Sequence, residues 1–289
     1  MILNILVTGG TGSFGQKCIK KLCAQAGWGK IIVYSRDEHK QEAMQQHFID
    51  DRLRFFIGDI RDKDRLQLAT EEATHIIHAA ALKIVPAAEY NPFEYVKTNI
   101  LGTQNLIDCC LNHPLSRQNY PKVIGLSTDK AVSPINLYGA TKLTMEKMLL
   151  AANNIRGEVG PTFNIVRYGN VANSNGSVIK IFQKHFLQKK PIPVTDRRMT
   201  RFWITLDDAV DFVLSKISTD ETGKVYIPEM PSFKIVDLAS CFSGNQILIG
   251  IRPGEKLHEE IEPGRASNDN TVWLSENDLR QKLILMGVL

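Results

Sequence analysis

The sequence predicts an α/β protein with a doubly wound parallel sheet, followed by a smaller C-terminal lobe. Short apolar runs alternate with helical patterns over the first part of the chain, and this alternation is typical of βαβ units and parallel sheets. The first apolar run enters a turn with glycine at every third position. Beyond residue 170 the alternation fades, and prolines divide the chain into short elements. We expect a sheet domain in residues 1–169 and the lobe in 170–289.

Each expected element rests on its own pattern. The strands are short apolar runs, which suit a sheet buried on both faces. The first helix is amphipathic, with apolar or small residues at Cys18, Ile19, Leu22, Cys23 and Ala26. The helix after the second strand is polar. The expected strands are 2–8, 30–35, 54–57, 75–78, 122–127 and 162–167, with a turn at 58–62, and the later helices are 38–49, 92–111 and 138–153.

Composition is that of a soluble globular protein. With 289 residues, 43% hydrophobic and 23% charged, the chain can hold one large core and a smaller lobe. Its 35 Lys and Arg and 31 Asp and Glu are interspersed, for a net charge of +4. We therefore expect no nucleic-acid arm, and a slightly basic cleft suits a phosphorylated ligand. No apolar run approaches the ~18 residues of a membrane span. No basic region precedes the apolar start, so we expect no signal peptide.

The cysteines and histidines show no metal-type spacing. The cysteines are odd in number, which favours reduced core residues in a cytoplasmic protein. His75, His78 and His113 are interpreted as core or surface residues. We expect no metal site. The five cysteines are Cys18, Cys23, Cys109, Cys110 and Cys241.

The glycine-rich turn predicts dinucleotide binding. Gly9, Gly12 and Gly15 directly follow the apolar strand that ends at Thr8. Glycine here permits a tight turn, lets the backbone approach a pyrophosphate and lets the next helix pack closely on its strand. The phosphates then lie at the helix N-terminus. Glycines mark many ordinary turns, but a strand before and an amphipathic helix after favour the dinucleotide interpretation.

The end of the second strand bears on which nicotinamide cofactor binds. Arg36 can pair with a 2′-phosphate and Ser35 can donate a hydrogen bond to it, which favours NADP. Asp37 keeps NAD open, because a carboxylate there would hold a 2′-hydroxyl. Arg36 could instead pair only with surface carboxylates. Asp59 and Ile60 would flank the adenine ring, or Asp59 could be an ordinary exposed turn residue.

Residues 127–142 predict the chemistry. Tyr138 and Lys142 lie one helical turn apart, and a lysine ammonium that lowers the pKa of a tyrosine prepares it to take a proton from a hydroxyl. That chemistry serves hydride transfer. Asp129 and Lys130 offer a second acid and a second base, which simple alcohol oxidation does not need. The non-functional alternatives are that Asp129 and Lys130 only form a salt bridge at a strand end, and that Tyr138 and Lys142 share a helix face by chance.

A family resemblance adds to these patterns. The chain resembles the extended short-chain dehydrogenase/reductases and, within them, the inverting 4,6-dehydratases of UDP-N-acetylglucosamine. The resemblance runs from Ile2 to about Glu260, and the tail beyond it is dissimilar. It is carried by TGGTGSFG, YSRDE, FFIGDIRD, HAAALK, STDK, YGATK, RYGNV, MTRFWIT and GIRPGEKLHE.

The resemblance implies roles for residues that the patterns alone leave open. It implies a substrate-binding function for most of the lobe, and it places Thr128 among the catalytic residues with Asp129, Lys130, Tyr138 and Lys142. The implied dinucleotide contacts are Gly9, Thr11, Gly12, Ser13, Phe14, Gly15, Ser35, Arg36, Asp37, Glu38, His39, Lys40, Asp59, Ile60, Ala79, Lys83, Ser127, Thr128, Tyr138 and Lys142. The implied UDP-sugar contacts are Lys83, Asn170, Val178, Thr195, Arg252 and Glu255.

The implied reaction removes water from the sugar. Tyr138 takes the 4-hydroxyl proton as hydride leaves carbon 4, a neutral Lys130 takes the carbon 5 proton, and a protonated Asp129 donates to the departing 6-hydroxyl. Hydride then returns to carbon 6, and reprotonation of the other face inverts carbon 5. The resemblance also implies a cytoplasmic homo-oligomer in pseudaminic acid-type or related glycan synthesis.

Two rival functions stay open. A UDP-sugar ketoreductase or epimerase would spare Lys130, because no water is lost. A non-catalytic NADP-binding sensor would have no need of all four residues Asp129, Lys130, Tyr138 and Lys142. Related dehydratases that act on dTDP-glucose carry Asp-Glu where this chain has Asp129-Lys130, and a lysine base suits inversion.

Overall fold

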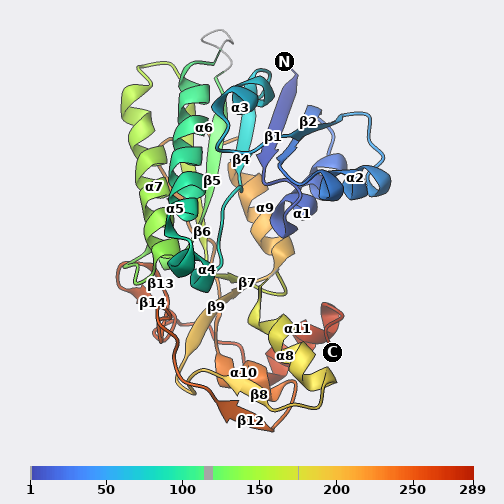
Figure 1. Ribbon diagram of the computed structural model, residues 1–289, viewed down its shortest axis with the longest axis vertical. Coiled ribbons are helices and arrows are strands. Elements are labelled where there is room, and N and C mark those ends of the chain that lie inside the picture. The colour runs from blue at the N-terminus through green and yellow to red at the C-terminus, as the bar shows by residue number, and fades with distance from the viewer. Residues whose placement is uncertain (1, 114–119, 175) are drawn as a thin grey trace.

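The computed structural model describes residues 2–113, 120–174 and 176–289. A layered α/β domain lies at one end of the long axis, and a smaller lobe lies at the other (Figure 1). The sheet strands are β1 (Leu3–Thr8), β2 (Trp28–Ser35), β3 (Leu53–Ile57), β4 (His75–His78), β5 (Lys122–Thr128), β6 (Thr162–Tyr168) and β10 (Val225–Tyr226). The helices around them are α1 (Ser13–Cys23), α2 (Glu38–His47), α3 (Lys63–Thr70), α4 (Val85–Tyr90), α5 (Pro92–Tyr95), α6 (Gly102–Leu111), α7 (Leu137–Ile155) and α9 (Leu206–Lys216), with a π-helix η1 (Val96–Leu101) and a 3-10 helix η2 (Asp129–Ala131).

The seven strands are parallel and run in the order β10-β6-β5-β4-β1-β2-β3. Helices α3, α6 and α7 bury one face of the sheet, with Leu66, Leu106 and Leu149 in that core. Helices α1, α2 and α9 bury the other face, which holds Ile19 and Val210. Strand order reverses between β1 and β4, and doubly wound sheets bind ligands at the carboxyl ends of their strands at such a point. The predicted Rossmann-type fold is confirmed.

The expected strands and helices are present, with differences in detail. The expected helix 92–111 is one run in which α5, η1 and α6 follow each other without a break. Helices α3 and α4 were not expected. Asp62, inside the predicted turn, accepts from the Arg65 amide and so starts α3. Beyond residue 170, α9 and β10 pack on the sheet rather than in the lobe.

The lobe has its own core, built from Phe182, Trp203, Phe233 and Leu279 among others. The C-terminal tail contributes to it, because α11 (residues 276–285) buries Leu279 and Leu283. The boundary at residue 170 stays a prediction. The lobe elements are β7 (Asn170–Val171), α8 (Val178–Leu187), β8 (Ile192–Val194), β9 (Thr200–Ile204), β11 (Ser232–Lys234), α10 (Ile235–Ser240), β12 (Gln246–Leu248), β13 (Glu260–Glu262), β14 (Arg265–Ala266) and α11 (Glu276–Leu285).

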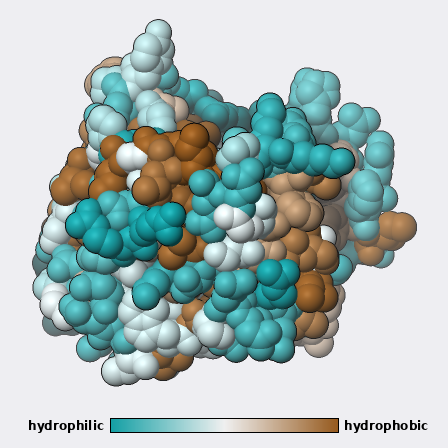
Figure 2. Space-filling model, turned by 90° about the horizontal axis from the view of Figure 1, so that it is seen from below, coloured by the Kyte–Doolittle hydropathy of each residue, from teal (hydrophilic) through white to brown (hydrophobic). Residues whose placement is uncertain are grey.

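Within the described ranges, every helix is too short or too polar to cross a lipid bilayer. Seen from the lobe end, the surface carries separate hydrophobic patches among hydrophilic residues (Figure 2). The exposed apolar residues of the lobe include Leu187 on α8, Leu248 on β12 and Leu285 on α11. The described residues also contain no cluster of three or more His, Cys, Asp or Glu side chains suited to a metal ion.

Candidate active site

The glycine-rich turn lies at the strand-order reversal. Gly9 follows β1 with φ of +68°, and a Cβ there would lie 2.9 Å from the backbone of Ala80, which follows β4. Only glycine therefore fits between these two strand ends. Gly12, Ser13, Phe14 and Gly15 form the cap and first turn of α1, whose amides face the strand ends. This is the geometry that receives a dinucleotide pyrophosphate.

A cleft at the ends of β2 and β3 continues from that turn. Its lining includes Gly9, Ser35, Arg36, Asp59 and Ile60. Thr11 Oγ1 and Ser35 Oγ lie 2.6 Å apart, so the turn and the end of β2 are held together. The structure thus places side by side the residues expected at the ribose and the adenine.

Arg36 and Asp37 differ in how they are engaged. The Arg36 side chain is 55% exposed, and its guanidinium is 3.8 Å from Asp59. Asp37 accepts a hydrogen bond from the Lys40 amide at the start of α2 and forms an ion pair with the Lys40 ammonium at 2.8 Å. The Asp37 carboxylate is therefore used as a helix cap, while the Arg36 guanidinium has solvent-facing capacity for a phosphate.

The other expected cofactor residues lie nearby or at the adjoining strand ends. Glu38 and His39 begin α2 with Lys40. Ala79 follows β4, and Lys83 is exposed on the segment between β4 and α4. Ser127 is the penultimate residue of β5, and its buried Oγ has no hydrogen-bond partner among the described residues. A buried hydroxyl without a partner is a candidate ligand contact.

The acid and base of the expected reaction lie at the end of β5. Asp129 is fully buried in η2, and its Oδ1 accepts from Lys130 Nζ at 3.0 Å and from Thr128 Oγ1 at 2.9 Å. Lys130 Nζ also lies 3.1 Å from Oε1 of Glu259, which is 2% exposed. One ammonium therefore bridges two buried carboxylates. Glu259 ends the matching motif GIRPGEKLHE, but sequence reasoning gave it no role.

The charge state of Lys130 differs from the expectation. Burial alone would lower the pKa of Lys130, but attraction to Asp129 and Glu259 outweighs burial and raises this pKa above its usual value. The prediction of a neutral lysine in the resting site is therefore wrong. Burial raises the pKa of Asp129, and repulsion by Glu259 adds to it against the effect of Lys130. That direction agrees with a protonated acid.

Tyr138 and Lys142 lie on the first turns of α7 and are both buried. Burial raises the pKa of Tyr138 to about 12, and the cation that opposes this rise is Lys130. Lys142 donates to Met145 Sδ at 2.9 Å, and burial lowers its pKa to about 8. The prediction that Lys142 lowers the pKa of Tyr138 is thus wrong for this structure, because the ammonium turns toward the thioether. A cation does act on Tyr138, but it comes from η2.

Two residues that the sequence did not single out hold this arrangement. Gly139 lets α7 approach η2, since a Cβ at that position would overlap the Lys130 carbonyl oxygen. Asn99, in η1, donates to Leu82 O and to Thr141 Oγ1 and accepts from Leu82 N. It ties the segment after β4 to the catalytic helix. A π-helical segment often marks such a functional position, but it has no clear sequence signal.

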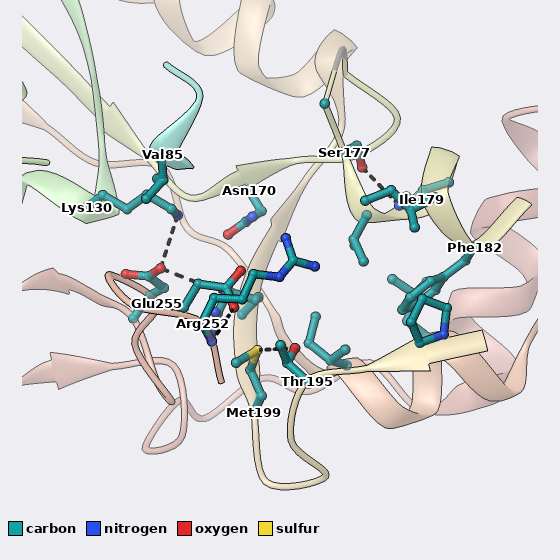
Figure 3. Close-up of a pocket in the computed structure, with 18 of the residues that line it drawn as sticks. Val85, Lys130, Asn170, Ser177, Ile179, Phe182, Thr195, Met199, Arg252 and Glu255 are labelled. Atoms are coloured by element: carbon teal, nitrogen blue, oxygen red, sulfur yellow. Dashed lines mark hydrogen bonds and ion pairs between the residues drawn. The ribbon is translucent and has the colours of Figure 1, made fainter. Parts of the chain in front are cut away.

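A cavity between the sheet domain and the lobe brings together most of the expected sugar contacts. Figure 3 shows Lys130 at one end of the cavity and Phe182 at the other. Arg252 and Glu255 lie on one irregular segment, and the Arg252 amide donates to the Glu255 carboxylate at 3.4 Å. The lining includes all of the expected UDP-sugar residues except Lys83: Asn170, Val178, Thr195, Arg252 and Glu255.

A family model described as a polysaccharide biosynthesis protein matches residues 5–274. The chain belongs to this family. It is 52% identical over 259 residues to "UDP-N-acetylglucosamine 4,6-dehydratase (inverting)" of Campylobacter jejuni, covering 89% of this chain and 76% of that protein. The predicted place among the extended short-chain dehydrogenase/reductases is confirmed. The prediction of an enzyme is also confirmed, and the two Campylobacter relatives are by name nucleotide-sugar 4,6-dehydratases.

Other relatives include a protein named for a different activity. The chain is 38% identical over 267 residues to a UDP-glucose 4-epimerase of Rickettsia rickettsii, covering 89% of this chain and 77% of that protein. The X-ray structure of Pen from Bacillus thuringiensis superposes with a TM-score of 0.90 at 33% identity, covering 98% of this chain and 97% of that chain. Family membership alone therefore leaves the reaction to be argued from the site.

Proposed function

We propose that the protein removes water from carbons 5 and 6 of UDP-N-acetylglucosamine, with NADP as cofactor and inversion at carbon 5. The observation that carries this proposal is the buried Asp129–Lys130 pair beside Tyr138. Lys130 also lines the cavity that holds the expected sugar contacts. A hydroxyl oxidation uses one proton acceptor, but loss of water also needs a base at carbon 5 and an acid at the leaving hydroxyl.

The cofactor proposal rests on the cleft at the strand ends. The turn at Gly9, the hydroxyl of Ser127 and the exposed guanidinium of Arg36 fit a dinucleotide with a 2′-phosphate. Asp37, the carboxylate that would favour NAD, is engaged as a helix cap. When bound, NADP would take a hydride from carbon 4 and return it to carbon 6.

The residues divide the proton transfers among them. Tyr138 takes the 4-hydroxyl proton, and the Lys130 charge favours its phenolate. Asp129 keeps its proton through burial and gives it to the 6-hydroxyl as water leaves. Lys130 first releases its resting proton to solvent, to which its side chain is 22% exposed, and the neutral amine then accepts the carbon 5 proton. Thr128 orients Asp129 through its hydroxyl hydrogen bond. Return of a proton to the opposite face of carbon 5 gives the L sugar.

The remaining expectations belong to the same proposal. Asn170, Val178, Thr195, Arg252 and Glu255 hold the UDP-sugar, with Lys83 at the side of the cofactor, and the product enters pseudaminic acid-type or related glycan synthesis. The protein works in the cytoplasm as a homo-oligomer. The exposed apolar residues of the lobe are compatible with an interface between copies.

The second candidate is a 4-epimerase, which the Rickettsia relative favours, or a ketoreductase. Mass spectrometry of purified protein incubated with UDP-N-acetylglucosamine separates the two. A product lighter by one water supports the dehydratase. An isomer of unchanged mass that chromatography separates from the substrate supports the epimerase, and a two-hydrogen change that consumes added cofactor supports the ketoreductase. If the sugar is unchanged in every respect while NADP still binds, the function is that of a sensor.

A further inference from the structure

Glu259 is a buried, charged residue at this site to which the proposed reaction gives no role. Its carboxylate is 2% exposed, and only one of its two oxygens is engaged. An unpaired buried carboxylate is costly unless its charge is compensated, so its presence needs a physical reason. Lys130 supplies that compensation at 3.1 Å.

The backbone around Glu259 is fixed more firmly than a loop carboxylate requires. Its amide donates to Ser267 Oγ at 3.0 Å, and its carbonyl accepts from the Ser267 amide at 2.8 Å. Ser267 Oγ also lies 2.7 Å from Thr200 Oγ1 on β9. The residues that flank the β13–β14 hairpin are thus tied to each other and to β9, which fixes the backbone from which the Glu259 carboxylate faces η2.

The charges that face Glu259 come from three parts of the chain. Asp129 and Lys130 face it from η2, Arg201 lies 3.9 Å away on β9, and Lys256 acts from the segment before β13. The Arg201 guanidinium donates its hydrogen bonds to the carbonyl oxygens of Thr200, Lys256 and Leu257. Lys130 is thus the close partner of Glu259.

We propose that Glu259 is a positioning residue for water loss: its carboxylate holds the Lys130 ammonium against Asp129 and carries the negative charge of the group, so that Asp129 stays protonated. This inference rests on the proposed dehydratase function. With Glu259 ionised beside Lys130, a second negative charge on Asp129 would be repelled by Glu259, so the protonated form of Asp129 is favoured. Without the Glu259 charge this repulsion is lost, and Asp129 gives up more easily the proton that the leaving hydroxyl needs.

The direction of the effect follows from these charges. Glu259 raises the pKa values of both Asp129 and Lys130. Glu259→Gln removes the charge and keeps the shape, so both pKa values fall. An acid that must be protonated and a base that must be neutral then both operate at lower pH, and the whole pH profile of kcat moves downward.

The test compares Glu259→Gln with Glu259→Asp, which keeps the charge, and with Glu262→Gln, a half-exposed carboxylate on the same hairpin that pairs with Arg265. We expect Glu259→Gln to lower kcat for dehydration ~10-fold or more, below the ~10²–10⁴-fold of a lost acid or base, and to shift its pH profile downward. The other two variants keep the parental pH range. A raised Michaelis constant with unchanged kcat would make Glu259 a substrate ligand and overturn the proposal.

A second measurement needs no turnover. Acetic anhydride acetylates only neutral amines, so labelling of Lys130 against pH, read by peptide mass spectrometry, reports its proton directly. We expect labelling to begin at lower pH in Glu259→Gln than in the parent, Glu259→Asp and Glu262→Gln. Identical labelling curves would overturn the proposal. If the parent forms no dehydrated product, the proposed function fails, and the labelling curves still decide whether Glu259 controls the charge of Lys130.

Discussion

The dinucleotide cleft and the acid–base group beside it are assembled in different ways. The cleft takes most of its lining from the carboxyl ends of β1 to β4 in the first half of the chain. The acid–base group joins Asp129 and Lys130 on η2 to Glu259, which reaches the site from the C-terminal segment. Backbone geometry fixes the shape of the cleft, whereas the acid–base group is stabilised by the attraction between its buried opposite charges. A single substitution should therefore weaken binding in the first region but stop chemistry in the second.

The largest effect is expected at Lys130. Lys130→Ala leaves Tyr138 to accept the 4-hydroxyl proton, although without the cation that favours its phenolate. It removes the base for carbon 5 and one compensating charge between two buried carboxylates. We expect dehydrated product to fall by ~10²–10⁴-fold, while addition of substrate still reduces some bound NADP, visible as absorbance of the reduced nicotinamide. Lys234→Ala, at an exposed lysine of β11, is the control. Near-parental dehydration by Lys130→Ala would make this lysine structural.

A companion variant sharpens the division of labour within the group. Asp129→Asn removes the acid but keeps the lysine, so loss of water slows. Exchange of the carbon 5 hydrogen with deuterated solvent should persist, because it depends on the base alone. Loss of both processes together would show that Asp129 is needed to hold Lys130 as well as to donate a proton. Mass spectrometry of recovered substrate measures the exchange.

The next effect is expected in the cleft. If Arg36 pairs with the 2′-phosphate, Arg36→Ala weakens NADP binding by about 1.5–3 kcal/mol, the range for hydrogen bonds to charged groups, and changes NAD binding little. Calorimetry on protein stripped of cofactor measures both affinities. Arg54→Ala, at an exposed arginine of β3, serves as the control. Equal losses for the two cofactors would assign Arg36 to its surface ion pair with Asp59.

A smaller effect is expected at the mouth of the lobe cavity. Arg252 is exposed, so solvent screens its interaction with a phosphate, and we expect about 1 kcal/mol, or roughly fivefold in the Michaelis constant, from Arg252→Ala. The absorbance of bound cofactor should not change. Arg198→Ala, an exposed arginine paired with Asp196, is the matched control. Unchanged UDP affinity would remove Arg252 from the substrate site.

The smallest effect concerns stability. His78 is buried between Thr8 and Thr103, and burial lowers its pKa to about 3. The unfolded chain takes up this proton below about pH 6.5, while the folded protein does not until near pH 3, so the free energy of unfolding falls as pH drops through that window. We expect His78→Gln to remove about 1–2 kcal/mol of the difference between pH 7 and pH 5 in urea unfolding. Replacement of the exposed His47 should leave this difference unchanged.

The sequence by itself determined the features that depend on neighbouring residues. The apolar runs of β1, β2, β4, β5 and β6, the glycine turn and the YGATK helix carry local patterns, and the structure places them as predicted. Carboxyl ends of parallel strands share one edge of the sheet. The sequence therefore also predicted that Ser35, Asp59 and Asp129 lie along the same edge. The proposed sugar contacts required the family resemblance, since no pattern in the sequence links Thr195 with Arg252.

Only the tertiary structure decided the charges and partners at the centre of the site. The pKa of a buried group depends on which charges lie within a few ångströms, and Glu259 comes close to Lys130 only when the lobe folds back on η2. The same reason explains why Lys130 is charged and why it, rather than Lys142, acts on Tyr138. The pairing of β10 with β6 was also decided by the tertiary structure. Val225 and Tyr226 lie far from β6 in the sequence and pair with it only after the chain has passed through the lobe.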